Sequence, residues 1–150
     1  EGSGYRVPGS AKESDRTREK MPVSKALVTY RDLEVWKKSI ELVVSIYKLT
    51  KCFPDIERYG LTSQVQRAAV SIPANIAEGY GRAHRREYLQ HLSIARGSLA
   101  ELETHLVIAV KLEYVSRAQI KTTWKLAQDV GMMLNRLCSS LSVQDIKAKS

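Results

Sequence analysis

The sequence is poor in the residues that build sheets, disulfide frameworks and membrane spans. Aromatic residues make up only 7% of the chain, and its 150 residues include 8 glycines, 4 prolines and 2 cysteines. Alanine, leucine, valine and isoleucine dominate the apolar set, which favours packed helices over sheets. No apolar run is long enough to span a membrane, and no continuous apolar segment of the signal-peptide type opens the chain. We therefore expect a helical, cytoplasmic protein without a membrane partner.

Length and composition predict one folded domain between polar ends. A chain of 150 residues buries about two thirds of its unfolded surface, so it needs neither disulfides nor a metal to fold. Residues 1–29 are rich in glycine, serine and charged side chains and are predicted to form a flexible tail, in which Met21 is a candidate natural start. Residues 30–143 are predicted to form the domain, and residues 144–150 a flexible C-terminus.

Four amphipathic segments predict an all-α domain, an antiparallel up-down-up-down four-helix bundle. The first segment should begin with Asp32 as N-cap and end at Phe53 and Pro54, and the second should begin at Thr62 or Ser63. The apolar face of the first segment is expected to comprise Leu33, Trp36, Ile40, Val43 and Tyr47, with Thr50 as a candidate last position.

The third and fourth segments have the clearest apolar seams. The third begins at about Ala83, and its apolar residues recur at alternating steps of four and three: Tyr88, Leu92, Ala95, Leu99, Leu102, Leu106 and Ala109. Ser116 and Gln119 predict a capping box at the start of the fourth segment. Its apolar face comprises Ile120, Trp124, Ala127, Gly131, Leu134, Cys138 and Leu141. The antiparallel order places Cys52 and Cys138 at opposite ends, so we expect two free, buried or half-buried thiols.

The second segment carries its apolar spacing straight through Pro73. A proline inside a helix lacks the N–H that the preceding turn needs and costs about 3 kcal/mol, so we expect a kinked but continuous helix held by close packing. Small residues of the third segment offer places where this helix can nest, and polar residues lie beside the kink. The candidates for this packing, with a subunit interface as the alternative, are Pro73, Asn75, Glu78, Gly97, Ser98 and Glu101.

The same region resembles a known family. SIPANIAEGYGR, residues 71–82, followed by LSIARGSLAELE, residues 92–103, is similar to the 23S rRNA intervening sequence proteins, also called S23 or four helix bundle proteins. The resemblance covers residues 30–141 and implies a homo-oligomer, a ring-shaped homopentamer. Members are encoded within insertions in ribosomal RNA genes. Related accessory variability determinant proteins of diversity-generating retroelements are basic pentamers that bind nucleic acid and a reverse transcriptase.

The sequence contains no recognisable constellation of catalytic residues. His84, His91 and His105 fall on one helix stripe, but seven residues of helix rise about 10.5 Å, too far for one metal ion to bind two imidazoles. We interpret them as exposed histidines beside acidic neighbours. Glu101 and Glu103 are two residues apart on a helix and face different directions, so they cannot form an acid–base pair. We expect no enzyme activity, no metal and no cofactor, and the resemblance implies no catalytic residue.

The charge distribution gives the main indication of function. The net charge is +8, and because residues 1–21 carry five basic and four acidic side chains, a charge of +7 belongs to the remainder. The antiparallel topology places many cations at one end of the bundle: Arg31, Lys37, Lys38, Arg82, Arg85, Arg86, Arg136, Lys147 and Lys149. Such a surface attracts polyanions, and contacts to phosphates carry no base specificity.

The leading hypothesis is therefore RNA or DNA binding through Arg82, Arg85 and Arg86, supported by Arg31, Lys37 and Lys38. Trp36 and Trp124 fall on seam positions and are interpreted as core residues rather than base-stacking platforms. The alternative is that these cations form an ordinary solvated surface without a nucleic-acid partner, since basic faces are common on proteins. The competing hypothesis is a scaffold that holds a protein, such as a polymerase or reverse transcriptase, without contacting nucleic acid.

Overall fold

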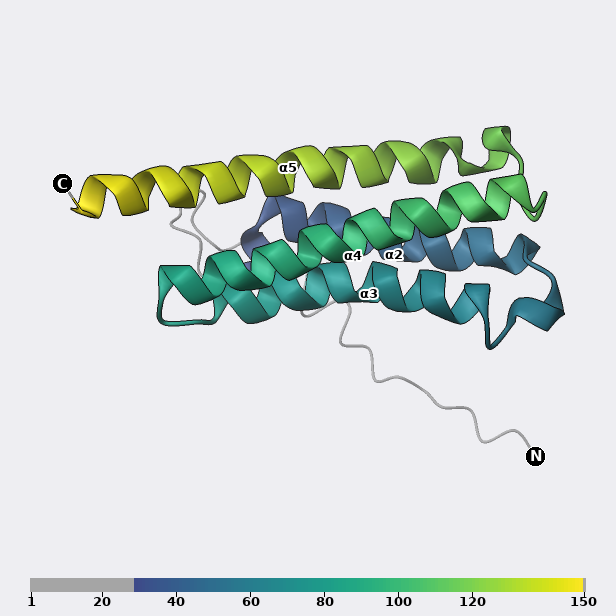
Figure 1. Cartoon of the computed structure of the whole chain (residues 1–150), viewed down its shortest axis with the longest axis horizontal. Helices are drawn as coiled ribbons and strands as arrows, with labels where there is room; N and C mark the ends of the chain where they lie inside the picture. Colours follow the sequence, from purple (N-terminus) through teal and green to yellow (C-terminus); the bar gives the residue numbers. More distant parts are fainter. Residues whose placement is uncertain (1–28, 150) are drawn as a thin grey trace, which may run out of the picture.

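The computed structural model describes the backbone of residues 29–149, which is helical apart from short connections (Figure 1). Four long helices are present in this part of the chain: α2 (Glu34–Leu49), α3 (Leu61–Tyr80), α4 (Arg85–Lys111) and α5 (Arg117–Lys149). Three single 3-10 turns accompany them: η1 (Tyr30–Asp32), η2 (Thr50–Cys52) and η3 (Asp55–Glu57). Successive long helices run in opposite directions, which confirms the predicted antiparallel bundle. The tail predicted for residues 1–29 lies, except for its last residue, outside the described residues.

Helix α3 passes through Pro73 without interruption, as predicted. Its buried face includes Val65, Ala68, Ile72 and Ile76, and Pro73 itself is buried. Helix α3 forms its most extensive packing with α4. Burial on both sides of the proline offsets the cost of the missing backbone hydrogen bond.

The seam of α4 is also confirmed. Every predicted position from the second onward is buried: Leu92, Ala95, Leu99, Leu102, Leu106 and Ala109. On α5 the buried residues are Thr123, Ala127, Val130 and Leu134, while Ile120 and Trp124 are half-buried beside them. The hydroxyl of Thr123 shares a hydrogen bond of 2.6 Å with that of Ser45, which links α5 to α2.

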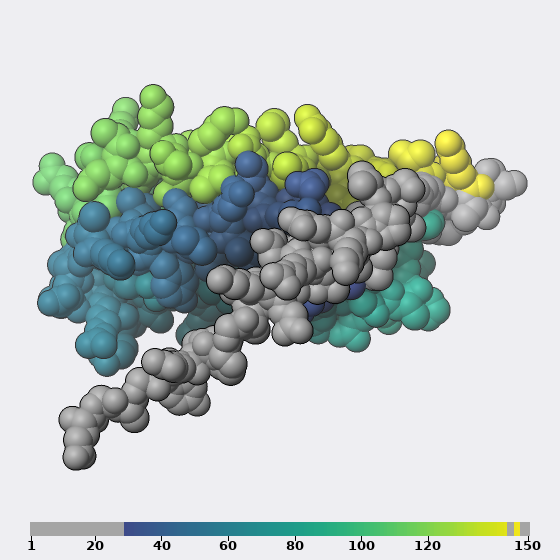
Figure 2. Space-filling model, turned by 180° about the vertical axis from the view of Figure 1, so that it is seen from behind, coloured from purple at the N-terminus to yellow at the C-terminus, as the bar shows by residue number. Residues whose placement is uncertain are grey.

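The predicted apolar face of α2 is displaced. The helix buries Val35, Ser39, Leu42, Ile46 and Leu49, whereas the predicted Ile40 and Tyr47 are exposed. Helix α2 packs against both α3 and α5, and the reverse view shows it lying alongside α5 (Figure 2). The buried Ser39 hydroxyl donates to the carbonyl of Trp36 at 2.7 Å, so a polar residue occupies a core position without an unpaired group.

Two of the four predicted helix starts are wrong. Asp32 belongs to a capping box with Thr29 around η1, and α2 begins only after Leu33. Helix α3 begins after Gly60 rather than at Thr62 or Ser63, and the carboxylate of Glu57 accepts from the Leu61 N–H at 2.8 Å.

The start of α5 follows the prediction. The N–H of Ser116 donates to the Gln119 side chain at 2.8 Å, and the N–H of Gln119 donates to the Ser116 hydroxyl at 3.1 Å. Helix α5 runs to Lys149, past the domain boundary predicted at residue 143, and projects beyond the other helices (Figure 1). No glycine or proline interrupts residues 144–149.

The two cysteines are both free thiols. Cys138 is half-buried, as expected, but Cys52 is exposed, contrary to the prediction. Cys52 lies in η2, where the chain leaves the core between α2 and the loop before α3, so the end of the bundle does not cover it.

Candidate nucleic-acid interface

The connection between α3 and α4 positions three arginines at one end of the bundle. Helix α3 ends at Tyr80, and the N–H of Arg82 donates to the carbonyl of Gly79 at 3.1 Å. Helix α4 begins at Arg85 directly after His84, which supplies no side-chain cap. Arg82, Arg85 and Arg86 therefore lie within a short turn and the first turn of α4.

Close contact between α3 and α4 fixes this connection. A Cβ atom added to Gly79 would lie 2.7 Å from Cβ of His91 and 3.1 Å from Cδ1 of Tyr88, so only glycine permits the approach. The rings of Tyr80 and Tyr88 pack edge to face with centroids 6.0 Å apart. Burial is the main cause that raises the pKa of Tyr88 to about 12, followed by the neighbouring Tyr80 and Cys138.

The three arginines differ in how far their charge is compensated. Arg82 pairs with Glu78 at 2.8 Å, and both side chains are about half exposed, so solvent and salt screen the pair. Arg85 is half-buried, whereas Arg86 is exposed and forms no ion pair within residues 29–149. The positive end of the α4 dipole adds to the charge of this turn.

The start of α2 lies toward the same end of the bundle, but its cations are largely compensated (Figure 1). The Lys37 ammonium is 3.2 Å from a carboxylate oxygen of Glu34, and that of Lys38 is 3.7 Å from one of Glu41. The guanidinium of Arg31 lies over the Tyr30 ring, 5.5 Å from its centroid. The excess of positive charge is therefore at the α3–α4 connection rather than on α2.

A hydrogen-bonded network occupies several of the residues predicted for packing or a subunit interface. The Asn75 amide donates to the carbonyl and hydroxyl of Ser71 at 2.8 and 3.0 Å, and its oxygen is 3.2 Å from Nδ1 of His91. The hydroxyls of Ser71 and Ser98 are 2.8 Å apart. These contacts, which flank the buried Pro73, join α3 to α4.

Other predicted residues lie outside this network. Gly97 is exposed, and a Cβ added there would have no atom within 4 Å, so the expectation that α3 nests against Gly97 is wrong. Glu78 and Glu101 are exposed, and Glu101 lies 3.3 Å from Nε2 of His105. Gly97 and Glu101 are thus available to a second subunit, whereas Asn75 and Ser98 are used within the chain.

The histidines are less exposed than the sequence suggested. Only His84 is exposed, because His91 packs against α3 and His105 turns its ring toward the bundle. Nδ1 of His105 is buried and finds no hydrogen-bond partner within the described part of the chain. Among the described residues, no three histidine, cysteine, aspartate or glutamate side chains are grouped so that they could hold a metal ion.

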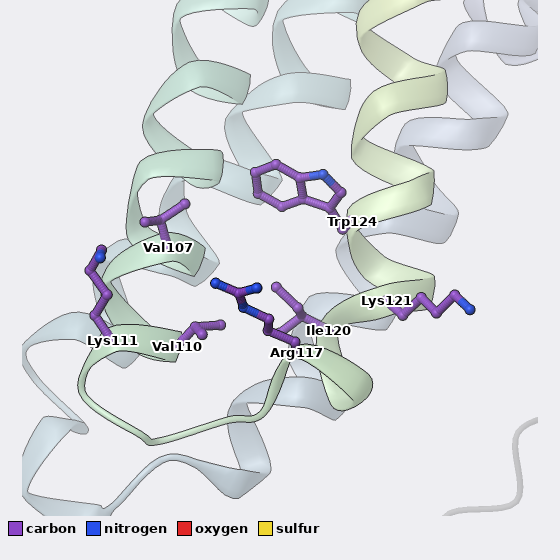
Figure 3. A pocket seen from close by; sticks show the side chains of 7 residues that line it. All are labelled: Val107, Val110, Lys111, Arg117, Ile120, Lys121 and Trp124. Atoms are coloured by element: carbon purple, nitrogen blue, oxygen red, sulfur yellow. The ribbon is translucent and has the colours of Figure 1, made fainter.

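A second basic feature, which sequence analysis missed, lies at the other end of the bundle. A cavity of about 400 Å³ opens between the end of α4 and the start of α5, and its walls are mainly apolar (Figure 3). Trp124 reaches across it from α5 toward α4, and the guanidinium of Arg117 lies between the two helices. Lys111 and Lys121 complete the rim, one on each helix. Trp124 is half-buried and packs against the core, in line with its predicted seam position, but it also borders this cavity.

These features define the class of protein: an antiparallel bundle of four helices with a basic inter-helix connection at one end. The family model of the 23S rRNA-intervening sequence protein matches residues 31–136. This chain belongs to that family, which confirms the resemblance noted in its sequence. No helix among residues 29–149 has the length and apolar character required to cross a membrane.

A solved structure supports the assignment. The chain is similar to a protein of unknown function from the S23 ribosomal protein family of Bacteroides thetaiotaomicron, with 27% sequence identity and a TM-score of 0.65. The similarity covers 69% of this chain and 97% of that one. No curated protein matches the sequence.

Proposed function

We propose that this protein is a non-enzymatic homo-oligomer that binds RNA or DNA without sequence specificity through the arginine cluster, which comprises Arg82, Arg85 and Arg86. The observation that carries the proposal is the excess of exposed positive charge at the α3–α4 connection. Arg82 and Arg86 are exposed there, and Arg86 forms no ion pair within residues 29–149. Arginine binds phosphate oxygens through several parallel hydrogen bonds, which suits a polyanion backbone.

The compensated cations of α2 have a secondary role. Lys37 and Lys38 must leave Glu34 and Glu41 before they contact phosphates, although both pairs are partly exposed and therefore weak. Arg31 needs no such exchange, since it lies over Tyr30 rather than against a carboxylate. We expect Arg31 to contribute more to binding than either lysine.

Self-association would multiply the field of the cluster. An exposed apolar stripe on α2, formed by Ile40, Val44 and Tyr47, and the exposed Gly97 side of α4 supply surfaces that a second subunit can cover. Closed rings repeat the same contact between successive subunits, so every copy of the arginine cluster would lie on one side of the ring. The ring-shaped pentamer implied by the family resemblance has this property.

The test is a salt titration of binding to generic RNA and DNA. Each lost phosphate contact should lower the slope of log K against log salt by about 0.9 for a DNA duplex and about 0.7 for a single strand. Replacing all three arginines of the cluster with alanine should reduce both affinity and slope, to a similar extent for unrelated sequences. The matched control removes three exposed cations from the opposite end of α2 and the following loop: Lys48, Lys51 and Arg58.

The control separates a defined surface from net charge. Equal losses in the two triple variants would show that overall charge, rather than the cluster, attracts nucleic acid. Unchanged binding in the arginine variant would refute the proposed surface. The scaffold alternative uses the exposed stripe of α2 and predicts a polymerase-type partner that stays bound after nuclease treatment and after the arginine substitutions.

A further inference from the structure

We propose that the cavity between α4 and α5 binds a nucleoside phosphate, with the base against Trp124 and the phosphate at Arg117. The inference rests on the proposed function, since it names the nucleotide chemistry that a second contact would recognise. The cavity lies at the end of the bundle opposite the arginine cluster, and nothing in the chemistry of that cluster accounts for it (Figures 1 and 3).

The cavity has the size and lining of a small-ligand site. Its volume of about 400 Å³ falls within the range of about 300–1,000 Å³ that is typical of ligand pockets. Val107, Val110 and Ile120 form apolar walls on both helices. An aromatic base has apolar faces that such walls can cover, while its edge and sugar stay near the opening.

The charge of the rim selects an anion. Arg117, Lys111 and Lys121 all border the cavity, and no acidic residue of the described part of the chain lines it. None of the three forms an ion pair within residues 29–149. An apolar cavity surrounded by three uncompensated cations complements a ligand that has an aromatic body and a negatively charged group.

The side chains divide these roles. The guanidinium of Arg117 lies between the helices below the indole of Trp124, whereas Lys111 and Lys121 point outward on either side (Figure 3). Arg117 is therefore placed for direct contact with a phosphate, and the lysines contribute mainly to the local field. An indole is a good stacking partner for any base, so this site would accept different bases.

The turn between the helices holds the rim in place. Glu113, which follows the C-cap residue Leu112 of α4, adopts the left-handed conformation, at φ 63°. The N–H groups of Glu113 and Tyr114 donate to the carbonyls of Val110 and Ala109, each at 3.0 Å, in the pattern of a Schellman motif. This closed turn fixes the end of α4 opposite the capped start of α5.

Binding is tested by tryptophan fluorescence of the full chain carrying Trp36→Phe, in which Trp124 is the only indole. Adenosine monophosphate should quench this signal in a saturable way, and adenosine should bind at least tenfold more weakly because it lacks the phosphate. Arg117→Ala should weaken the monophosphate at least tenfold. Arg67→Ala, which removes an exposed arginine of α3 outside the cavity, should leave the affinity unchanged.

Calorimetry of the unmodified protein and of Arg117→Ala gives the same comparison if Trp36→Phe perturbs folding. A single-stranded adenosine oligonucleotide distinguishes the two sources of the ligand: tighter binding than the monophosphate indicates nucleic acid, and equal or weaker binding indicates the free nucleotide. The proposal is overturned if the monophosphate does not bind, or binds equally well to Arg117→Ala. It is also overturned if Trp124 fluorescence responds only to dilution, which would place a second copy in the cavity.

These outcomes are separable from those for the arginine cluster. Loss of RNA binding in the arginine-cluster variant with intact monophosphate binding would leave both proposals standing. Absence of monophosphate binding with salt-dependent RNA binding intact would remove only the cavity proposal. Monophosphate binding in a protein whose RNA affinity does not depend on the cluster would remove only the proposed surface.

Discussion

Gly79→Ala should destabilise the bundle because glycine is required where α3 and α4 meet. The added Cβ would lie 2.7 Å from Cβ of His91, 3.1 Å from Cδ1 of Tyr88 and 3.3 Å from the Tyr88 carbonyl oxygen. Ordinary van der Waals contacts of a Cβ atom fall at 3.4–4 Å. The two helices must therefore separate by several tenths of an ångström, and neither His91 Cβ nor a backbone carbonyl can move independently of α4.

The expected magnitude is the difference between two opposing effects. Overpacking of this kind costs about 1–3 kcal/mol. Alanine is better than glycine inside a helix by about 0.5–1 kcal/mol. The net loss should be about 1–2 kcal/mol, which lowers Tm by about 4–8 °C for a domain of this size. Thermal and urea unfolding followed by circular dichroism at one fixed protein concentration measure this loss, because association changes apparent stability.

Gly97→Ala provides the matched control in the neighbouring helix. Within one subunit an added Cβ would meet no atom of the described residues within 4 Å, so the gain in helix propensity should raise the stability of the unassociated chain by about 0.5–1 kcal/mol. A Gly79→Ala protein as stable as the unmodified chain would refute the close contact. Equal changes in both variants would show that propensity alone governs these positions.

Two further substitutions test the turns and the buried polar groups. Tyr88→Phe should cost little or stabilise at neutral pH, because the Tyr88 hydroxyl is buried without a hydrogen-bond partner in the described residues and such burial costs about 1–3 kcal/mol. The raised pKa of Tyr88, about 12, means that the folded state keeps a proton that the unfolded state loses near pH 10. The contribution of the protonated Tyr88 to stability is therefore complete below about pH 10 and declines toward about pH 12. Urea unfolding at several pH values should show a smaller decline in Tyr88→Phe than in the unmodified protein. An identical decline in both proteins would contradict the raised pKa of Tyr88. Glu113→Gly should raise the free energy of unfolding by about 1 kcal/mol, since φ 63° is strained for glutamate and free for glycine, and a loss of stability in a urea titration would count against this turn.

The sequence predicts α3 and α4 well because each has one narrow apolar stripe that faces one main partner. The steps from Leu92 to Ala109 follow the helical period, so the buried residues can be read directly from the spacing. Helix α2 has two partners, α3 and α5, and its buried stripe includes Ser39. Periodicity counts a serine as polar, and only the local bond from Ser39 to the Trp36 carbonyl reveals that it is satisfied inside the core.

Helix starts show a similar division between local and longer-range information. The capping box of Ser116 and Gln119 is contained in four residues and is predicted correctly. The start of α3 depends on Glu57, which lies in η3 before the helix and reaches the Leu61 N–H. A search for serine or threonine at the N-cap cannot find this arrangement, since the carboxylate approaches from outside the usual capping position.

The two candidate sites also differ in how much of each can be predicted from local sequence spacing. The sequence shows which residues are cationic, and the spacing of Glu34 to Lys37 and of Lys38 to Glu41 already allows the pairs that neutralise α2. When cations in such i,i+3 pairs are left out of the count, Arg86 becomes a stronger candidate for phosphate binding than Lys37 or Lys38. The rim of the α4–α5 cavity could not be found by such counting, because it depends on a left-handed residue at Glu113 and on how far apart two helices lie. Neither property follows from side-chain spacing. The position of Arg117 at the rim of the cavity is therefore apparent only from the conformation of the turn.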